Sequence, residues 1–494
     1  MVASLPEMLD AVIRAHAKRT AVVEGETAVS YESLARRIGT LASKLYASRV
    51  RKGDRVALLL PNGLDFVTAF FSVSRLGAIV VPLNFQYQQE EVFQVVNACR
   101  VSMVVVARES ASLWEQNPRL RDADCRLLIV SGEAEIAEGS TMLCDSDVYG
   151  DIDPNSPVLY QFSSGTTGIP KRIGRTHKNL LFEIRTLIRT LDITQNERFL
   201  GVTPFSHVNG LMRSMMVSVA AGATLYPLPK FERRAVADII EKHRLTIFIG
   251  VPFMFGALAK TNFERPPDFS SVRLCLSASA PLPSKLNRQF HDRFGIYIRQ
   301  LYGSTETGTI SVNLSADIGV SLESVGRPLT GVDVEVFTEN GKPARANEVG
   351  EVAVKSPAAI KSYDGCDGGD KDAFRDGYYL TGDLARKDDH GLFYLVGRKK
   401  LFINKGGYKI NPQEIEELIA THPKVEETVV MGLPTPYGDE KVKAVIVLND
   451  LCTEREIIEH CRGKIAHFKI PSLIEFREGL PRTPAGKIRR EMLV

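Results

Sequence analysis

The sequence predicts an α/β protein that is divided into several units: two α/β units, a small antiparallel β unit and a C-terminal α+β domain. Up to about residue 324, short β-branched apolar runs alternate with segments of helical periodicity, which is typical of parallel sheets with crossover helices. The runs then become short and alternating, with frequent Gly and Asn. From residue 410 onward, helical patterns return between the strands.

Length and composition agree with this division. The 494 residues exceed the roughly 100 to 200 residues of one domain. Hydrophobic residues make up 44% and charged residues 24%, which excludes the composition of a disordered chain. The net charge of +3 is too small on this length to indicate nucleic acid or an acidic membrane as a partner.

The first α/β unit is expected from a strand–helix–strand pattern. Residues 56–60 and 78–81 are short apolar runs, separated by a turn at Pro61 and Asn62 and by an amphipathic segment that continues to Leu76. Residues 101–107 form a further buried run. Parallel strands joined by a helix account for this order.

The second α/β unit repeats the pattern, and two further regions follow it. Its expected strands are 198–203, 245–251, 272–277 and 297–301, with helices at 235–243 and 284–294. The antiparallel unit is expected from segments 332–337, 351–355 and 392–396. The C-terminal domain is expected from a helix at 412–421 and strands at 427–431 and 443–447.

Cysteine usage and hydropathy indicate a cytoplasmic protein with no membrane span. The seven cysteines are scattered, odd in number and free of any C-x-x-C spacing, which argues against a disulfide framework and a zinc site. The first 20 residues lack the apolar core of a signal peptide. The longest uncharged stretch, 214–229, is shorter than the about 20 residues of a membrane helix, so we expect it to be buried.

A loop rich in Ser, Thr and Gly at residues 160–171 is suited to binding phosphate. Glycines allow backbone N–H groups to turn toward one anion, and Lys171 could add a positive charge. The loop is not a Walker A motif, because Ile169 and Pro170 separate Gly168 from the lysine. A flexible linker would have the same composition. The loop residues are Ser163, Ser164, Gly165, Thr166, Thr167 and Gly168.

A second motif, at residues 302–308, follows an expected strand, where ligands bind in open α/β sheets. Glu306 could hold Mg²⁺ together with phosphate oxygens, and the ring of Tyr302 could cover a purine. An N-capped turn is the alternative, since Ser and Thr before Glu also form a capping box.

Two weaker motifs complete the set. Asp383 and Arg398 flank one expected hairpin, and they could bind ribose hydroxyls and phosphate. Lys487 follows a Pro/Gly loop near the chain end. A turn Asp, a surface Arg and a solvated Lys are the ordinary explanations of these residues when each is taken alone.

Together and in this order, the motifs resemble those of the adenylate-forming superfamily of acyl-CoA synthetases, peptide-synthetase adenylation domains and luciferases. The resemblance extends from segments 31–34 and 53–56 to Lys487. It implies catalysis by Lys487, Glu306, Thr166 and His207, with Glu306 and Thr166 at Mg²⁺. It also implies contacts to ATP or coenzyme A from Ser163, Ser164, Gly165, Thr167, Gly168, Lys171, Ser279, Ala280, Tyr302, Gly303, Thr305, Asp383, Arg398, Lys400, Gly406 and Gly407.

The resemblance further implies a large N-terminal domain, residues 1–399, whose β unit is barrel-like, and a mobile C-terminal domain, residues 400–494. Members of the superfamily rotate the small domain about one residue, which aligns with Lys400. The rotation exchanges Lys487, used in adenylation, for Gly406 and Gly407, used in thiolation. Two departures from the superfamily pattern are Arg172, where a Gly is usual, and Asn404, where some ligases carry Lys.

The acid is expected to lack an α-amino group. His207 aligns with the residue that gates the acyl pocket, although a core or surface histidine is the alternative. Val208 stands where amino-acid-activating relatives place Asp. The pocket is expected to include Val251, 275–280 and 307–308, and both aromatic and short-to-medium aliphatic acids fit this description. Coenzyme A is the expected acceptor; the alternatives are a separate carrier protein, a luciferase-like oxygenase and a catalytically silent nucleotide-binding regulator.

Overall fold

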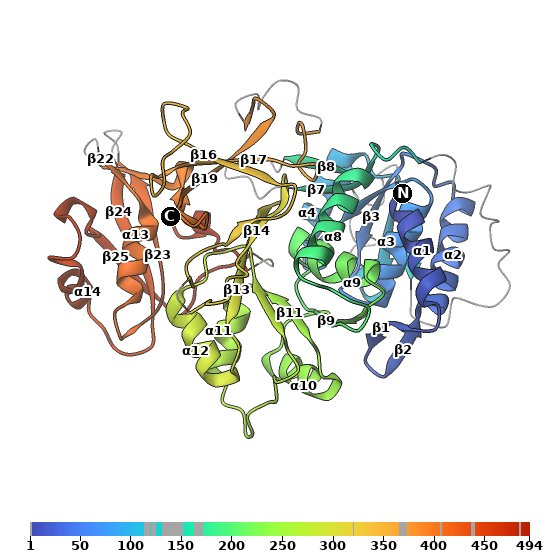
Figure 1. Cartoon of the computed structure of the whole chain (residues 1–494), viewed down its shortest axis with the longest axis horizontal. Coiled ribbons are helices and arrows are strands. Elements are labelled where there is room, and N and C mark those ends of the chain that lie inside the picture. The colour runs from blue at the N-terminus through green and yellow to red at the C-terminus, as the bar shows by residue number, and fades with distance from the viewer. Residues whose placement is uncertain are drawn as a thin grey trace.

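The computed structural model consists of two α/β units, an antiparallel β unit and a C-terminal unit. The N-terminal unit and the C-terminal unit lie at opposite ends, as Figure 1 shows. The described residues are 2–112, 119, 125–130, 152–162, 171–319, 321–364, 373–405, 408–435, 440–483 and 486–494.

The first α/β unit contains a six-stranded sheet with the order β6-β5-β3-β4-β7-β8. All neighbours are parallel except β8, which returns antiparallel to β7. The strands are β3 Arg55–Leu59, β4 Ile79–Pro82, β5 Met103–Ala107, β6 Arg126–Val130, β7 Pro157–Phe162 and β8 Arg172–Thr176. The helices are α1 Leu5–His16, α2 Tyr31–Ala47, α3 Leu64–Arg75, α4 Gln89–Cys99 and the 3₁₀ turn η1 Arg108–Ser110. The expected strand–helix–strand pattern is confirmed as β3–α3–β4.

The second α/β unit contains a nine-stranded sheet with the order β15-β14-β13-β12-β11-β9-β10-β1-β2. Its strands are β1 Thr20–Glu24, β2 Thr27–Ser30, β9 Arg198–Gly201, β10 Thr224–Pro227, β11 Ile247–Gly250, β12 Leu274–Ser277, β13 Ile298–Ser304, β14 Gly308–Val312 and β15 Arg327–Pro328. Its helices are α8 His177–Thr190, η3 Asn209–Met216, α9 Val217–Ala220, α10 Arg233–His243, α11 Pro252–Lys260 and α12 Ser284–Phe294. The four strands expected from the sequence are confirmed as β9, β11, β12 and β13.

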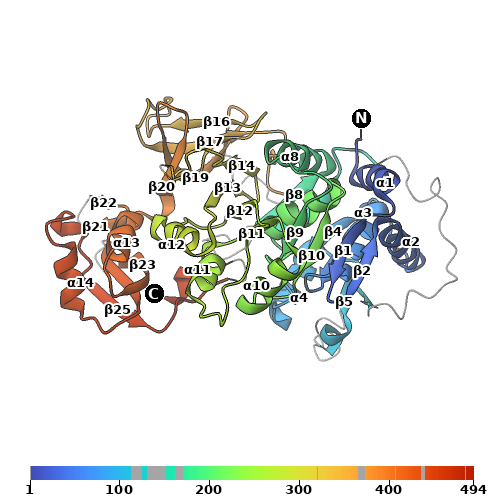
Figure 2. The ribbon, with the colours of Figure 1, turned by 60° about the horizontal axis from the view of Figure 1, so that its bottom comes forward.

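Alternate residues of the central strands enter different cores, as the two-residue period of a strand requires. Val56 and Leu58 of β3 belong to the large core between the two sheets, whereas Ala57 and Leu59 pack on the opposite face. The helices α2, α3 and α8 contribute to the large core. On the outer faces, α4 covers the first sheet, and α10, α11 and α12 cover the second (Figure 2). The two units therefore form alternating layers of helix and sheet.

The antiparallel unit and the C-terminal unit complete the chain. In the antiparallel sheet, β16 Asp333–Phe337, β17 Gly350–Lys355, β18 Phe374–Arg375, β19 Tyr378–Lys387 and β20 Phe393–Arg398 pair in the order β16-β17-β19-β18, with β20 also on β19. The C-terminal unit contains η5 Lys399–Leu401, β21 Ile403–Lys405, β22 Tyr408–Ile410, α13 Pro412–Ala420, β23 Val425–Pro434, β24 Glu440–Leu448, α14 Glu454–Cys461, η6 His467–Lys469, β25 Leu473–Arg477 and η7 Arg490–Met492. One core of this unit takes all its members from residues 403–474.

The uncharged stretch 214–229 is mostly buried, as expected from the sequence, and only Pro229 at its end is exposed. It covers the end of η3, all of α9 and β10. The helix η3 is a π-helix, which the sequence did not predict. Among the described residues, no helix is both long and apolar enough to span a bilayer. The described cysteines, Cys99, Cys125, Cys275, Cys452 and Cys461, are free thiols.

Candidate active site

The structure brings Tyr302, Asp383 and Arg398 into one cluster. Asp383 of β19 and Arg398 of β20 are paired residues of a hairpin, and Arg398 Nε lies 2.5 Å from Asp383 Oδ1. The Tyr302 hydroxyl donates to Asp383 Oδ2 at 2.7 Å. Burial, and then the Asp383 charge, raise the pKa of Tyr302 far above its usual value, so the phenol stays protonated. The second α/β unit and the β unit therefore meet at this carboxylate.

Lys487 joins this cluster from the C-terminal unit. Burial among protein groups and the Arg398 charge lower the pKa of the Lys487 ammonium, whereas Glu306 and Asp383 oppose the shift. The side chain is nevertheless accessible to solvent, so it can meet a bound molecule. Its loop packs closely on the second unit, because a Cβ at Gly486 would lie 2.8 Å from Val251 Cγ2. Glycine is also suited to the left-handed φ of +80° at that position.

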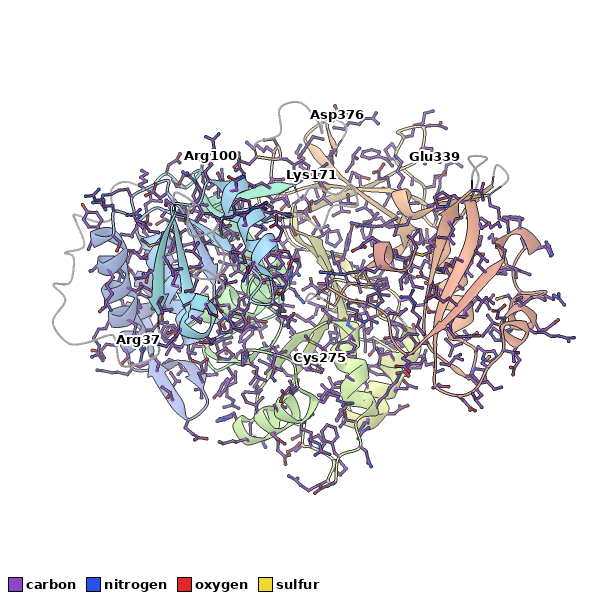
Figure 3. The ribbon with its side chains drawn as sticks, turned by 180° about the vertical axis from the view of Figure 1, so that it is seen from behind. Arg37, Arg100, Lys171, Cys275, Glu339 and Asp376 are labelled. Carbon is purple, nitrogen blue, oxygen red and sulfur yellow. The ribbon has the colours of Figure 1, made fainter. Side chains whose placement is uncertain are left out.

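Tyr363, which the sequence analysis did not single out, contacts Glu306, and Tyr379 contacts Tyr363. The Tyr363 hydroxyl donates to Glu306 Oε1 at 3.2 Å and lies 2.9 Å from the Tyr379 hydroxyl. Lys171 Nζ lies 4.9 Å from the centre of the Tyr363 ring, within the range of a cation–π interaction. Figure 3 labels Lys171 near the strands of the first sheet. Tyr363 thus links the end of the Ser/Thr/Gly loop to the Glu306 carboxylate.

The hairpin β13–β14 carries most of the second motif. The expected strand 297–301 continues to Ser304, and the segment then turns back into β14, so no helix begins there. At the tip, the Ser304 and Thr307 side chains each accept a hydrogen bond from the other residue's backbone N–H. Gly303 permits the close approach of the two strands, because a Cβ there would lie 2.3 Å from Gly308 O. Thr305 is half-buried beside Glu306.

The segment after β12 has an unusual backbone. Ser279 has a φ of +74°, a left-handed conformation that non-glycine residues adopt rarely and that is concentrated at ligand sites. Ser279 and Ala280 are half-buried and follow the carboxyl end of β12. Ligands of open α/β sheets bind at that end of the strands.

His207 lies near enough to Lys487 for the lysine charge to act on its ring. Burial, and then the Lys487 charge, lower the pKa of His207 to about 4, so the ring is neutral at physiological pH. Its Nε2 atom is buried and has no hydrogen-bond partner among the described residues. The neighbouring Val208 packs against the large apolar core.

Several expected site residues lie outside the described residues: Ser163, Ser164, Gly165, Thr166, Thr167, Gly168, Gly406 and Gly407. The backbone at Lys400 belongs to η5, and its side chain is outside the description. The departure Arg172 forms an ion pair with Asp364, with Nε 3.3 Å from Oδ2, and lies over the Tyr160 ring. Arg172 therefore ties β8 to the segment that contains Tyr363.

Comparison with known proteins assigns the family. The AMP-binding enzyme model matches residues 9–364, and the model of the AMP-binding enzyme C-terminal domain matches residues 414–487. A feruloyl-CoA synthase of Amycolatopsis sp is 33% identical over 95% of this chain and 94% of that protein. An indoleacetate–CoA ligase of Aromatoleum aromaticum is 30% identical over 99% of this chain and 97% of that protein.

Solved structures agree. ATP-bound MatB from Rhodopseudomonas palustris matches with a TM-score of 0.91 and 26% identity, over 100% of this chain and 98% of that chain. The o-succinylbenzoate coenzyme A synthetase MenE from Bacillus subtilis, in complex with ATP and magnesium ion, matches with a TM-score of 0.86 and 26% identity over 98% of both chains. Fold and site together are those of an adenylate-forming enzyme. The chain belongs to the AMP-binding enzyme family, and the predicted class of AMP-forming acid–CoA ligase is confirmed.

Proposed function

We propose that this ligase activates a carboxylic acid whose non-reacting end is uncharged, and that it transfers the acyl group to coenzyme A. The observation that carries the proposal is the convergence of Lys487, Glu306, Asp383 and His207 from three units of the fold. In the first half-reaction, a carboxylate oxygen attacks the α-phosphorus of ATP and pyrophosphate leaves. In the second half-reaction, the thiol sulfur attacks the carbonyl carbon and AMP leaves.

The charges of the site suit the first half-reaction. A carboxylate and a triphosphate repel each other, so cations and donors must already be in place where they meet. Lys487 is the cation that faces both the acyl side, at His207, and the nucleotide side, at Asp383. The Tyr302–Asp383–Arg398 cluster would hold the nucleoside, since a carboxylate can accept from two ribose hydroxyls.

Glu306 fits a magnesium ion bound with ATP. Its carboxylate is oriented by Tyr363, and Mg²⁺ usually takes one or two carboxylates together with phosphate oxygens. No group of three or more His, Cys, Asp or Glu that could hold a metal ion occurs in the described part of the chain. Thr166 stays a predicted second ligand. When bound, the ion would neutralise phosphate charge.

The described side of the acyl pocket indicates the class of acid. His207 is neutral and Val208 is apolar, so neither would pair with an α-ammonium or a second carboxylate. Both an aromatic ring and an aliphatic chain suit this surface. The feruloyl-CoA and indoleacetate relatives favour an aromatic acid as the first to test.

The second half-reaction requires a different arrangement of the C-terminal domain. We propose that residues 400–494 rotate about Lys400, which lies in the short η5 turn between β20 and the C-terminal core. The contacts that must break include Lys260 to Glu426 at 2.5 Å and Arg482 over the Phe253 ring. Gly406 and Gly407 would then leave room for the pantetheine arm.

A panel of acids tests the proposed function. Pyrophosphate exchange into ATP should require both Mg²⁺ and an acid, and it should occur with aromatic or aliphatic monoacids rather than with α-amino acids or diacids. Addition of coenzyme A should then give the thioester. Exchange without thioester would indicate a carrier protein as the acceptor. ATP binding without exchange for any acid would contradict the proposal and favour the silent regulator.

Tyr363→Phe is expected to weaken the apparent Mg²⁺ affinity in acyl-AMP formation about tenfold, because the Glu306 carboxylate loses a hydrogen bond of roughly 1.5 kcal/mol. The measurement is the Mg²⁺ dependence of pyrophosphate exchange. Tyr394→Phe is the matched control, since Tyr394 donates to Asp388 at 3.1 Å within the β unit. An equal effect of the two substitutions would show that Tyr363 does not act through Glu306.

The lowered pKa of Lys487 predicts that the rate of acyl-AMP formation falls at alkaline pH. The charged form is present below the pKa, so the rate should fall as pH rises through a value below that of an ordinary lysine. Lys487→Arg should move this fall to higher pH, because guanidinium keeps its proton. Single-turnover acyl-AMP formation across pH is the measurement. If the rate falls at the same pH in the wild type and in Lys487→Arg, the fall is caused by the titration of another group.

A further inference from the structure

A cluster of buried charges lies against the β13–β14 hairpin. Arg175 of β8 is 0% exposed, Glu183 of α8 is 1% exposed, and Arg213 of η3 is 3% exposed. Charged side chains are almost never buried this deeply unless they are paired, and burying them costs free energy even then. Apolar residues of similar size could fill the same space at no cost in stability, so stability alone does not explain why the charges are there.

Glu183 is the centre of the cluster. Its Oε2 accepts a hydrogen bond from Arg175 Nη2 at 2.8 Å. Its Oε1 accepts two hydrogen bonds from Thr309, from the backbone N–H at 2.9 Å and from the hydroxyl at 2.8 Å. Arg213 Nε donates to the same Thr309 hydroxyl oxygen at 3.0 Å. The Glu183 carboxylate thus connects Arg175 to Thr309, the second residue of β14, and Arg213 joins them through the Thr309 hydroxyl.

The hairpin approaches these charges at its two glycines. A Cβ at Gly308 would lie 2.5 Å from Glu183 Oε2, and a Cβ at Gly303 would lie 2.9 Å from Arg213 Nη2. Arg175 Nη1 reaches the carbonyl oxygen of Thr305 at 3.5 Å, next to Glu306. The cluster therefore touches both strands and the loop between them.

Glu183 supplies the negative charge that compensates the buried charges of Arg175 and Arg213. Burial alone would raise the pKa of Glu183, but Arg175, Arg213 and the hydrogen bonds reverse the effect and lower it. Burial, with the Arg175 charge, lowers the pKa of Arg213 to about 10, so Arg213 stays charged at neutral pH. Without the Glu183 carboxylate, two guanidinium groups would remain in the interior with no counter-charge from this cluster.

We propose that Glu183 is a positioning residue that fixes the hairpin carrying Tyr302 and Glu306 relative to bound ATP. It acts through Thr309 and the two arginines. This inference rests on the proposed function, because it explains how that site keeps its shape. A shift of about 1 Å in a catalytic group can cost about a hundredfold in rate, so a rigid support beneath Glu306 has a direct catalytic consequence.

Glu183→Gln tests the inference, since it preserves size and removes the charge. We expect acyl-AMP formation to slow by about 10² and to need more Mg²⁺ for half-saturation. Thioester formation from supplied acyl-AMP should change much less, because Glu306 is not needed once pyrophosphate has left.

Glu197→Gln is the matched control. Glu197 is also a buried carboxylate, 7% exposed, and its Oε1 lies 2.8 Å from Arg273 Nη2, with a further hydrogen bond from the Thr246 hydroxyl. It precedes β9 at the amino end of the strand, whereas the candidate site lies at the carboxyl ends. Both variants should lose thermal stability, but only Glu183→Gln should form acyl-AMP more slowly and need more Mg²⁺ for half-saturation.

If both variants lose stability and keep the wild-type rate and Mg²⁺ dependence, Glu183 supports the fold alone and the inference is wrong. Should Glu183→Gln fail to fold, Thr309→Val removes only the shared hydroxyl, and an adenylation rate lowered about tenfold is expected; an unchanged rate would overturn the inference. Calorimetry of ATP binding with and without Mg²⁺ separates this inference from the proposed function. Loss of the Mg²⁺-dependent affinity in Glu183→Gln, but not in Glu197→Gln, would support the inference even if no acid were activated.

Discussion

Lys487→Ala is expected to slow acyl-AMP formation by about 10² to 10³, the usual effect of removing one preorganised electrostatic group. The reason is that Lys487 of the C-terminal unit interacts electrostatically with His207, Glu306 and Asp383. Thioester formation from supplied acyl-AMP should stay near the wild-type rate, because the proposed rotation takes Lys487 out of the site. Single-turnover assays of each half-reaction measure the two rates.

Lys441→Ala is the control for this variant. Lys441 is an exposed lysine on β24 of the same unit, and its removal should leave both half-reactions unchanged. If Lys487→Ala slows the two half-reactions in equal proportion, the role of Lys487 is not confined to adenylation. The proposed rotation, which replaces Lys487 by Gly406 and Gly407 in the site, would then be wrong.

Lys400→Pro is expected to have the opposite effect to Lys487→Ala: it should impair thioester formation more than acyl-AMP formation. Proline fixes φ near −65°, so it should hinder rotation about this residue while leaving the present arrangement at least partly accessible. Thioester formation from supplied acyl-AMP should therefore fall well below the wild-type rate, and acyl-AMP formation should fall less. Rapid-quench measurements of the two steps give the ratio.

Lys400→Ala separates the loss of the side chain from the loss of rotation. Alanine leaves φ free, so this variant should retain a higher thiolation rate than Lys400→Pro. Equal thiolation rates in the two variants would mean that the lysine side chain matters and the backbone rotation at this residue does not.

Local pattern was enough to predict most of the fold. The largely apolar runs at 56–60 and 272–277 became β3 and β12, because the signals that predict a strand, namely hydrophobic period, turn residues and run length, are all local in the sequence. The same holds for Asp383 and Arg398, which one hairpin turn brings together as register partners. Their contact was foreseeable, while their role toward ribose and phosphate stays a prediction.

Long-range polar contacts were not predictable from one sequence. Tyr363 reaches Glu306 across 57 positions, and Glu183 reaches Thr309 across 126 positions. No sequence pattern around Tyr363 predicts that its hydroxyl donates a hydrogen bond to a carboxylate. Glu183 stands in an amphipathic helix, where a charge usually indicates the solvent face. It is buried because α8 lies between two sheets and has little solvent face at this position.

The central claim is that the chain activates its acid as an acyl adenylate, and isotope transfer tests this most directly. An acid labelled with oxygen-18 in its carboxylate is incubated with the enzyme, ATP, Mg²⁺ and coenzyme A, and the products are analysed by mass spectrometry. Attack of the carboxylate on the α-phosphorus predicts that the AMP released with the thioester carries one labelled oxygen. Thioester accompanied by ADP and labelled inorganic phosphate, with no label in AMP, would contradict the account.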